Sequence, residues 1–211
     1  MKQSSITSEN SVPSDFARDI VGKAGIADPV MEEKLLGAFT TVERSKFIIA
    51  GYLDRVNEDI RIPIGFSQSS LKPSTLARMI GLLGIEKGMR VLEVGAGSGY
   101  GSALMLSCGA EVFCIEQAGL LAQQTRKKLD AMGFAKILFK AGDGLKGWPE
   151  LAPFDAIIVT FPASEPSREL LSQLKKDTGR LVGVFGEAGK VHLWLYDNSQ
   201  SQPYQLEPFS D

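Results

Sequence analysis

The chain has 211 residues, of which 44% are hydrophobic and 23% charged, and its formal net charge is −2. These totals predict one globular domain with a well-buried core, and the mixed charges lack the basic face that a nucleic-acid partner requires. The polar first residues do not form a signal peptide, and no run of about 18 apolar residues offers a membrane span. We therefore expect a cytoplasmic protein that binds neither nucleic acid nor membrane.

Two cysteines and one histidine restrict the chemistry further. Cys108 falls at the end of an expected helix and Cys114 inside an expected strand, so both are interpreted as free thiols in a reducing cytoplasm. His192 lies in the apolar run KVHLWLYD, where a strand residue is a simpler interpretation than a catalytic base. A disulfide framework and a multi-histidine metal site are excluded, and we expect no metal ion.

The first 72 residues are expected to form a mainly helical segment that packs on the core at its substrate side. Residues 1–13 are rich in serine and poor in apolar groups, which predicts a disordered start. Residues 15–25 have a helical pattern that Gly22 or Gly25 can stop. A second helix is expected over 30–42.

From residue 73 to residue 211 the pattern becomes regular and predicts the core of a single compact domain. A helix is expected between Pro73 and Gly84, because its apolar residues recur at a period near 3.6. Strands are expected over 89–95, 110–116, 136–143, 154–160, 179–186 and 190–197, and helices over 99–109, 119–133 and 165–176. This alternation predicts an α/β fold with a doubly wound, mostly parallel sheet covered by helices on both faces. Residues 198–211 turn polar and are expected on the surface.

The stretch VLEVGAGSGY, residues 91–100, links the first core strand to its helix. Gly95 and Gly97 fall at the turn, where glycine lets a ligand approach bare backbone, and a plain strand–helix turn would need only one glycine. Glu116 ends the next strand 21 positions after Gly95, where an acid can accept hydrogen bonds from ribose hydroxyls. Asp143 follows the third strand, where its carboxylate can accept from an adenine amine.

These residues favour a cationic adenosine cofactor over a dinucleotide. The dinucleotide fingerprint requires glycine at the position of Tyr100, and the carboxylate of Glu93 would repel a pyrophosphate. The same carboxylate suits an ammonium or a sulfonium group, and S-adenosyl-L-methionine carries both. The residues predicted to bind this cofactor are Glu93, Gly95, Ala96, Gly97, Glu116, Gln117, Asp143 and Gly144.

Several longer segments carry a family resemblance. FTTVERSKFI, residues 39–48, IPIGFSQSSLKP, residues 62–73, FKAGDGLKGWPELAPFDAIIVT, residues 139–160, and LLSQLKKDTGRLVGVFG, residues 170–186, resemble the protein-L-isoaspartate O-methyltransferases. The resemblance covers roughly residues 30–187. It implies a Rossmann-like class I methyltransferase that methylates isoaspartyl carboxylates in damaged proteins or peptides.

The chain departs from the family pattern where the substrate should bind. Without gaps, Gln68 matches the family's glutamine and Pro73 its proline, but Leu71 stands where the family has its active-site serine. At the end of the expected strand 154–160, Thr160 is kept while Phe161 replaces a small residue. The resemblance and the departure together make Ser69 and Ser70 the candidate catalytic residues and Gln68 and Thr160 the candidate substrate-binding residues.

Carboxyl methylation tolerates such a departure, because a carboxylate with a pKa near 4 is already ionised at neutral pH and needs no general base. The absence of a second histidine agrees with this reaction, since methylating an amine, a phenol or a carbon usually benefits from a base. Two alternatives remain: a methyltransferase that acts on a different acceptor, and a non-catalytic module that only binds the cofactor. The oligomeric state is left open by the sequence.

Overall fold

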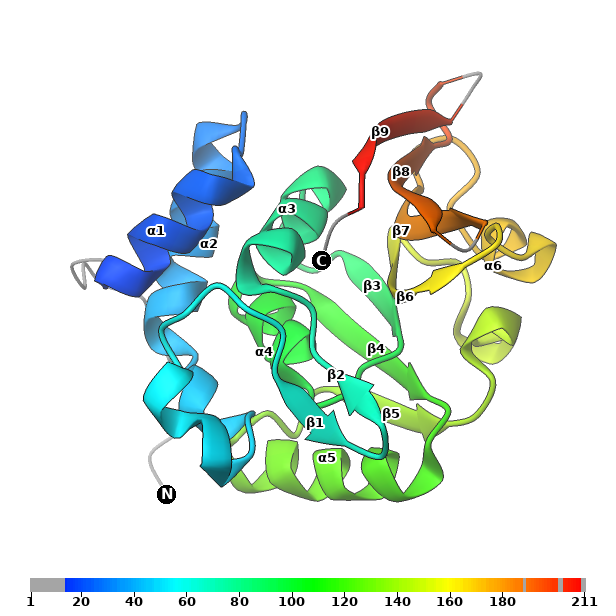
Figure 1. Ribbon diagram of the computed structural model, residues 1–211. Coiled ribbons are helices and arrows are strands. Elements are labelled where there is room, and N and C mark those ends of the chain that lie inside the picture. Colours follow the sequence, from blue (N-terminus) through cyan, green and yellow to red (C-terminus); the bar gives the residue numbers. More distant parts are fainter. Residues whose placement is uncertain (1–13, 188, 201–202, 210–211) are drawn as a thin grey trace, which may run out of the picture.

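A seven-stranded sheet forms the centre of the computed structural model, which describes residues 14–187, 189–200 and 203–209 (Figure 1). Its strand order is β5-β4-β3-β6-β7-β8-β9. The strands are β3 (Arg90–Val94), β4 (Glu111–Glu116), β5 (Leu138–Ala141), β6 (Ala156–Ala163), β7 (Arg180–Glu187), β8 (Lys190–Asp197) and β9 (Tyr204–Pro208). The strands from β5 to β7 pair in parallel, whereas β8 and β9 are antiparallel to their neighbours. The mostly parallel sheet is confirmed, and the predicted disorder of residues 1–13 lies outside the described residues.

Helices cover both faces of the sheet, as the sequence predicts. They are α1 (Asp15–Ala24), α2 (Pro29–Thr41), α3 (Pro73–Leu83), α4 (Tyr100–Ser107), α5 (Gly119–Ala131) and α6 (Arg168–Ser172), with four short 3₁₀ turns, η1 (Arg44–Lys46), η2 (Ala50–Arg55), η3 (Gly144–Lys146) and η4 (Pro149–Leu151). In Figure 1, α1 and α2 lie together on one side of α3, while α6 lies at the opposite side of the sheet. Gly25, with a φ of 60°, ends α1, so this glycine rather than Gly22 is the stop signal.

The sixth helix is shorter than predicted. The expected span 165–176 contains only five helical residues, because the chain after Ser172 returns to an extended path beside Phe154. The backbone N–H of Phe154 donates to the carbonyl of Gln173 at 2.8 Å, and the N–H of Lys175 donates to the carbonyl of Phe154 at 2.8 Å. These long-range hydrogen bonds use backbone groups that a longer helix would have paired internally.

Alternate residues of the parallel strands supply two separate cores. Val91, Cys114 and Ile158 face one side, where they pack with α1, α2, α3 and α4. Leu92 and Ile115 face the other side, where they pack with α6 and the segment around Phe154. Because side chains alternate along a strand, Glu93 shares the face of Val91 and lies under α4.

The last strand was not predicted. Residues 198–200 and 203–209 are mostly exposed, as expected, yet Tyr204–Pro208 form β9 at the edge of the sheet beside β8. Phe209 continues this pairing, because its N–H donates to the carbonyl of Val191 at 2.9 Å. An edge strand with one solvated face buries few apolar residues, so its sequence pattern is weak.

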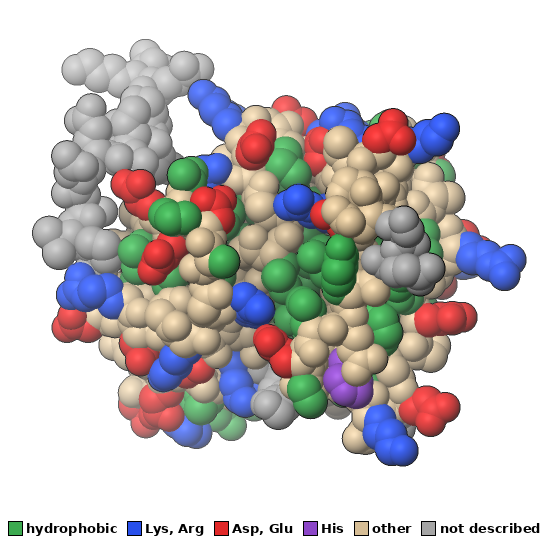
Figure 2. Space-filling model, turned by 90° about the horizontal axis from the view of Figure 1, so that it is seen from above, with side chains coloured by type: hydrophobic (Ala, Val, Ile, Leu, Met, Phe, Trp, Pro, Cys, Tyr) green, Lys and Arg blue, Asp and Glu red, His purple; other side chains and the backbone are tan. Residues whose placement is uncertain are grey.

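The upper face of the molecule carries charges of both signs, with hydrophobic side chains gathered near its middle (Figure 2). Acidic and basic groups alternate around this area rather than forming a field of one sign. Among the helices of the described residues, none combines the length and the apolar composition that crossing a membrane requires.

A small hairpin, also absent from the predictions, precedes α3. It pairs β1 (Pro63–Gly65) with β2 (Gln68–Ser69), and its two-residue turn consists of Phe66 and Ser67. Both turn residues have positive φ, 53° and 57°, which is the backbone conformation of the type I′ turns that favour glycine and asparagine. The turn of the hairpin therefore holds two non-glycine residues in a backbone conformation that L-residues seldom adopt.

Replacing Ser67 by glycine is expected to raise the free energy of unfolding by about 0.5–1 kcal/mol, because it relieves the left-handed strain at a small entropic cost. Urea denaturation would measure the change. Ser69→Gly is the matched control, since Ser69 is a β2 residue outside the positive-φ turn, and glycine in a strand destabilises. Equal effects of the two substitutions would contradict the strain at the turn.

Candidate active site

A cavity of about 620 Å³ opens at the carboxyl ends of β3 and β6. The chain leaves β3 toward β4 on one side and β6 toward β7 on the other, so this is the point where a doubly wound sheet reverses its strand order and binds ligands. All residues singled out for the cofactor and the substrate lie in its lining: Gln68, Ser69, Ser70, Glu93, Gly95, Ala96, Gly97, Glu116, Gln117, Asp143, Gly144 and Thr160. Tertiary structure thus brings every predicted site residue together, while their individual roles stay predictions.

The glycine loop between β3 and α4 is tightly held on both sides. The N–H of Gly95 donates to the carbonyl of Ile115 at 2.8 Å, and the Thr160 hydroxyl donates to the carbonyl of Gly95 at 2.5 Å. Gly95 and Gly97 have φ values of 91° and 53°. A Cβ on Gly97 would lie 2.8 Å from Cδ1 of Ile64 in the hairpin, so the missing side chains let loop and hairpin meet across the cavity.

Glu116 is bound to this loop through its side chain. Its Oε2 accepts from the N–H of Gly97 at 2.9 Å, and its Oε1 accepts from the N–H of Ala118 at 2.9 Å. The amide nitrogen of Gln68 lies 3.5 Å from the same Oε1, so the hairpin and the end of β4 meet at the cavity, and the role of Gln68 in substrate binding stays a prediction. Glu116 is only 3% exposed, so its carboxylate is an oriented acceptor placed beneath the cavity.

Asp143 and Gly144 line a third part of the cavity, just after the end of β5. One oxygen of Asp143 accepts from the N–H of Leu145 at 3.0 Å and caps η3, while the side chain is otherwise exposed. Gly144 is buried, and a Cβ there would collide with Val94, so only glycine fits between η3 and the end of β3. Gln117 follows Glu116 in the lining.

Glu93 differs from these acids because it lies inside the protein. Its carboxylate accepts from the hydroxyl of Ser102 and lies 3.6 Å from the thiol of Cys114, and the residue is 2% exposed. Burial, the largest influence, raises the pKa of Glu93 to about 7, and the nearby Glu116 adds to this rise. The hydrogen bonds from Ser102 and Cys114 act in the opposite direction.

The three candidate hydroxyls on the acceptor side are not equivalent. Thr160 directs its proton to the backbone of the glycine loop, and Ser69 is exposed. Ser70 accepts from the N–H of Ile62 at 3.1 Å, which leaves its proton available to a ligand. Leu71 lines the cavity beside it and packs against the core.

Several residues that line the cavity were not among the site residues predicted from the sequence. Arg44 is buried and donates to the carbonyls of Val56, Glu58 and Ile60 at 2.8, 2.6 and 2.9 Å, which fixes the chain that leads into the hairpin. Burial lowers the pKa of Arg44. Its only signal in the sequence was its place in FTTVERSKFI, residues 39–48, one of the segments that carry the family resemblance.

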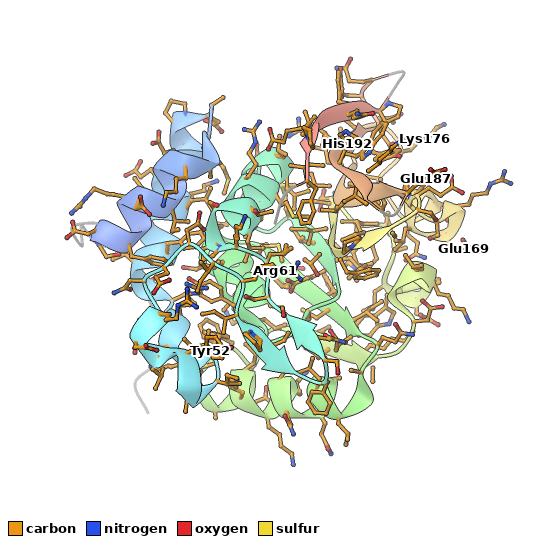
Figure 3. All side chains as sticks on the ribbon, in the orientation of Figure 1. Tyr52, Arg61, Glu169, Lys176, Glu187 and His192 are labelled. Atoms are coloured by element: carbon orange, nitrogen blue, oxygen red, sulfur yellow. The ribbon has the colours of Figure 1, made fainter. Side chains whose placement is uncertain are left out.

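Arg61, Tyr100 and Phe209 also belong to the lining and had no signal of their own. Arg61 lies near the middle of the view in Figure 3, whereas His192 lies apart from it on β8. His192 pairs in register with Phe185, which confirms its interpretation as a strand residue outside the site. Tyr100 has a buried hydroxyl without a hydrogen-bond partner among the described residues.

The donor and acceptor set fits an adenosine cofactor with a cationic amino-acid end. Bare backbone at Gly95 and Gly97 lets a ligand approach the loop. The charged side chains that line the cavity from the ends of β3, β4 and β5 are all acidic, whereas Arg44 and Arg61 line it from the segment before α3. A pyrophosphate would meet these carboxylates with repulsion, whereas ribose hydroxyls, an amine and an ammonium can all donate to them.

Sheet order and site location place the chain among the Rossmann-like class I methyltransferases. A solved protein-L-isoaspartate O-methyltransferase superposes with a TM-score of 0.77 and 25% sequence identity, over 90% of this chain and 62% of that chain. A Plasmodium falciparum structure, described as such an enzyme in complex with S-adenosyl-L-homocysteine, superposes with a TM-score of 0.73 over 93% of this chain and 97% of that one, at 19% identity.

The protein-L-isoaspartate(D-aspartate) O-methyltransferase family matches residues 20–207, and the chain belongs to this family. A protein-L-isoaspartate O-methyltransferase of Christiangramia forsetii is 44% identical over 162 residues, which cover 77% of this chain and 74% of that one. The enzyme of that name from Chromobacterium violaceum is 38% identical over 183 residues, or 85% of this chain and 81% of its own. The resemblance noted in the sequence is thereby confirmed.

Proposed function

We propose that the protein transfers a methyl group from S-adenosyl-L-methionine to the carboxylate of L-isoaspartyl residues in damaged proteins or peptides. The observation that carries this proposal is that the glycine loop and its acids line the same cavity as the hydroxyls of the 68–70 segment. Family membership supports the same reaction. When bound, the cofactor supplies an electrophilic methyl group, and the protein's residues supply position and environment.

Glu93, Glu116 and Asp143 are assigned to the cofactor side. Glu116 accepts from ribose hydroxyls with the lone pairs that Gly97 and Ala118 leave unused, and the free oxygen of Asp143 accepts from the adenine amine. Glu93 faces the amino-acid end of the cofactor. Gly95, Ala96, Gly97, Gln117 and Gly144 complete this side through backbone and shape.

On the acceptor side, alignment replaces acid–base chemistry. An isoaspartyl carboxylate has a pKa near 4 and arrives ionised, so the protein must hold one oxygen about 3–3.5 Å from the methyl group and in line with it. Leu71 and Phe161 exclude water around this carboxylate, which strengthens its interactions inside the site. Residues 1–72 act as the substrate-side segment, because η1 and the hairpin form that wall of the cavity.

Ser70 is assigned as the residue that orients the acceptor. Since its oxygen already accepts from Ile62, its proton can be donated to the carboxylate oxygen that does not attack. Thr160 acts indirectly by holding the loop, and Ser69 contributes to the rim. Ser70 thus takes the place of the serine that Leu71 replaces.

Methyl transfer to an isoaspartyl peptide, measured beside its normal aspartyl twin, tests the proposal. Labelling of the isoaspartyl form alone is expected. Ser70→Ala should lower kcat/KM about tenfold, the value of one hydrogen bond to a charged group, while the exposed Ser69→Ala changes it little. Leu71→Ser should raise the same rate if the missing hydroxyl limits it.

A second candidate is methylation of another acceptor, favoured by the apolar Leu71 and Phe161 in the lining. Binding of S-adenosyl-L-homocysteine together with failure to label any isoaspartyl peptide would support it over the first. Labelling of a different class of molecule in an extract would then identify the acceptor. Binding without transfer to any acceptor would instead indicate a cofactor-binding module.

We also propose that the protein works in a reducing cytoplasm. Cys108 and Cys114 are both free and buried, and burial raises the pKa of Cys108 to about 12. Neither thiol is placed to serve as a nucleophile or to form a stabilising cross-link. Fluorescence microscopy of a tagged full-length chain would test the location.

A further inference from the structure

Glu93 is a buried acid of the cavity lining whose hydrogen-bond partners are all neutral groups. Its partners are the hydroxyl of Ser102 and the thiol of Cys114, and the two are themselves in contact at 3.1 Å. Within the described part of the chain, no lysine or arginine forms an ion pair with Glu93. A carboxylate in such surroundings loses hydration without gaining a counter-charge, and retaining a proton avoids this cost.

The groups around Glu93 reinforce this state. On β4, Cys114 stays neutral because burial raises its pKa well above the usual value, while the carboxylate of Glu116 repels a second negative charge. On α4, burial likewise raises the pKa of Tyr100, which shares the cavity lining with Glu93 and Arg44. From β6 the register partner is the apolar Ile158.

We propose that Glu93 is a proton-exchange site, which holds a proton in the unliganded protein and releases it when the cationic amino-acid end of the cofactor occupies the cavity. This inference rests on the proposed function, because it needs that cofactor in this cavity. The ammonium group supplies the counter-charge that the protein lacks, so the ionised form of Glu93 becomes the favoured one. The released proton goes to solvent, and no other group changes charge.

Cofactor binding is expected to weaken as the pH falls. The complex requires ionised Glu93, so affinity falls as pH drops through the value of about 7 at which Glu93 titrates in the unliganded protein. For one group of this kind, binding should be about tenfold weaker at pH 6 than at pH 8 and nearly constant above pH 8. Binding at pH 7 should release about half a proton per ligand, because half of the unliganded molecules are then protonated.

Calorimetric titration of the full chain with S-adenosyl-L-homocysteine tests the inference, since this ligand keeps the ammonium group and allows no turnover. Repeating the titration in buffers of different ionisation enthalpy gives the number of protons released. Glu93→Gln should bind without proton release and with an affinity that does not vary from pH 6 to pH 8. The control Glu33→Gln, at an exposed position of α2, should behave like the parent chain.

A second variant separates titration from a merely structural role. Ser102 donates to Glu93 and lowers its pKa, so Ser102→Ala should move the midpoint of the pH dependence upward. Without any ligand, Glu93 binds its proton more tightly in the folded chain than in the unfolded chain. The folded parent should therefore lose stability relative to Glu93→Gln as pH rises from about 4.5 to about 7.

The outcomes distinguish this inference from the function on which it rests. Tight ligand binding without proton release, or equal release by Glu93→Gln, would overturn the proton-exchange site and leave the proposed function standing. Absence of S-adenosyl-L-homocysteine binding at every pH would overturn the proposed function itself. An unchanged midpoint in Ser102→Ala would contradict the assignment of the titration to Glu93.

Discussion

Replacing Glu116 by alanine is expected to weaken cofactor binding by about 1.5–3 kcal/mol, or roughly ten- to hundredfold in dissociation constant. The buried carboxylate is the assigned ribose acceptor, and it also accepts from the N–H groups of Gly97 and Ala118. Alanine removes the ligand contact and leaves the buried N–H of Gly97 without its acceptor. The first loss removes a contact with the cofactor, and the second loosens the glycine loop beside it.

Titration with S-adenosyl-L-homocysteine would measure this change, together with a thermal melt to verify folding. Glu111→Ala is the matched control, because Glu111 lies at the opposite, exposed end of the same strand β4. Its affinity should equal that of the parent chain. An unchanged dissociation constant in Glu116→Ala would show that Glu116 does not contact the ribose.

Gly95→Ala is expected to lower the free energy of unfolding by about 2–5 kcal/mol and to abolish measurable cofactor binding. A φ of 91° costs an L-residue about 1–2 kcal/mol, and overpacking costs about 1–3 kcal/mol more. The added Cβ would lie 2.7 Å from Cδ1 of Phe161 and 2.7 Å from the hydroxyl oxygen of Thr160. The Thr160 hydrogen bond that positions the loop would be displaced.

Urea denaturation and ligand titration would check both effects. Combining Gly95→Ala with Phe161→Ala should restore part of the stability, because it removes one of the two clashes but not the strain in φ. Gly22→Ala in α1 is the control, since a Cβ there meets nothing within 4 Å and should stabilise the helix by about 0.5–1 kcal/mol. Wild-type stability in Gly95→Ala would contradict the close packing of this turn.

The sequence was most informative where local periodicity and long-range structure agree. Pro73–Leu83 is a helix because its apolar positions recur on one face and Gly84 caps it, and neighbouring elements only reinforce this preference. The parallel strands were recognisable from continuous apolar runs. The helix over 165–176 was overestimated because the hydrogen bonds of Phe154 with Gln173 and Lys175 are invisible in the local pattern.

The acids of the site were predictable for a geometric reason. Glu116 and Asp143 end or follow neighbouring parallel strands, and the carboxyl ends of such strands meet at one edge of the sheet. Their convergence on the glycine loop therefore follows from chain order alone. The hairpin turn at Phe66 and Ser67 lacked such a signal, because neither residue is typical of a turn with positive φ.

Residue order and local pattern were enough for the α/β class, the glycine loop, the acidic edge and the family resemblance. Tertiary structure alone decided that the Ser70 oxygen accepts from the N–H of Ile62, and it placed Phe209, which follows the last strand, in the lining of the cavity. It also decided that Glu93 is buried among neutral partners. Burial and hydrogen-bond partners depend on residues distant in sequence, so the charge state of a group emerges only when the chain has folded.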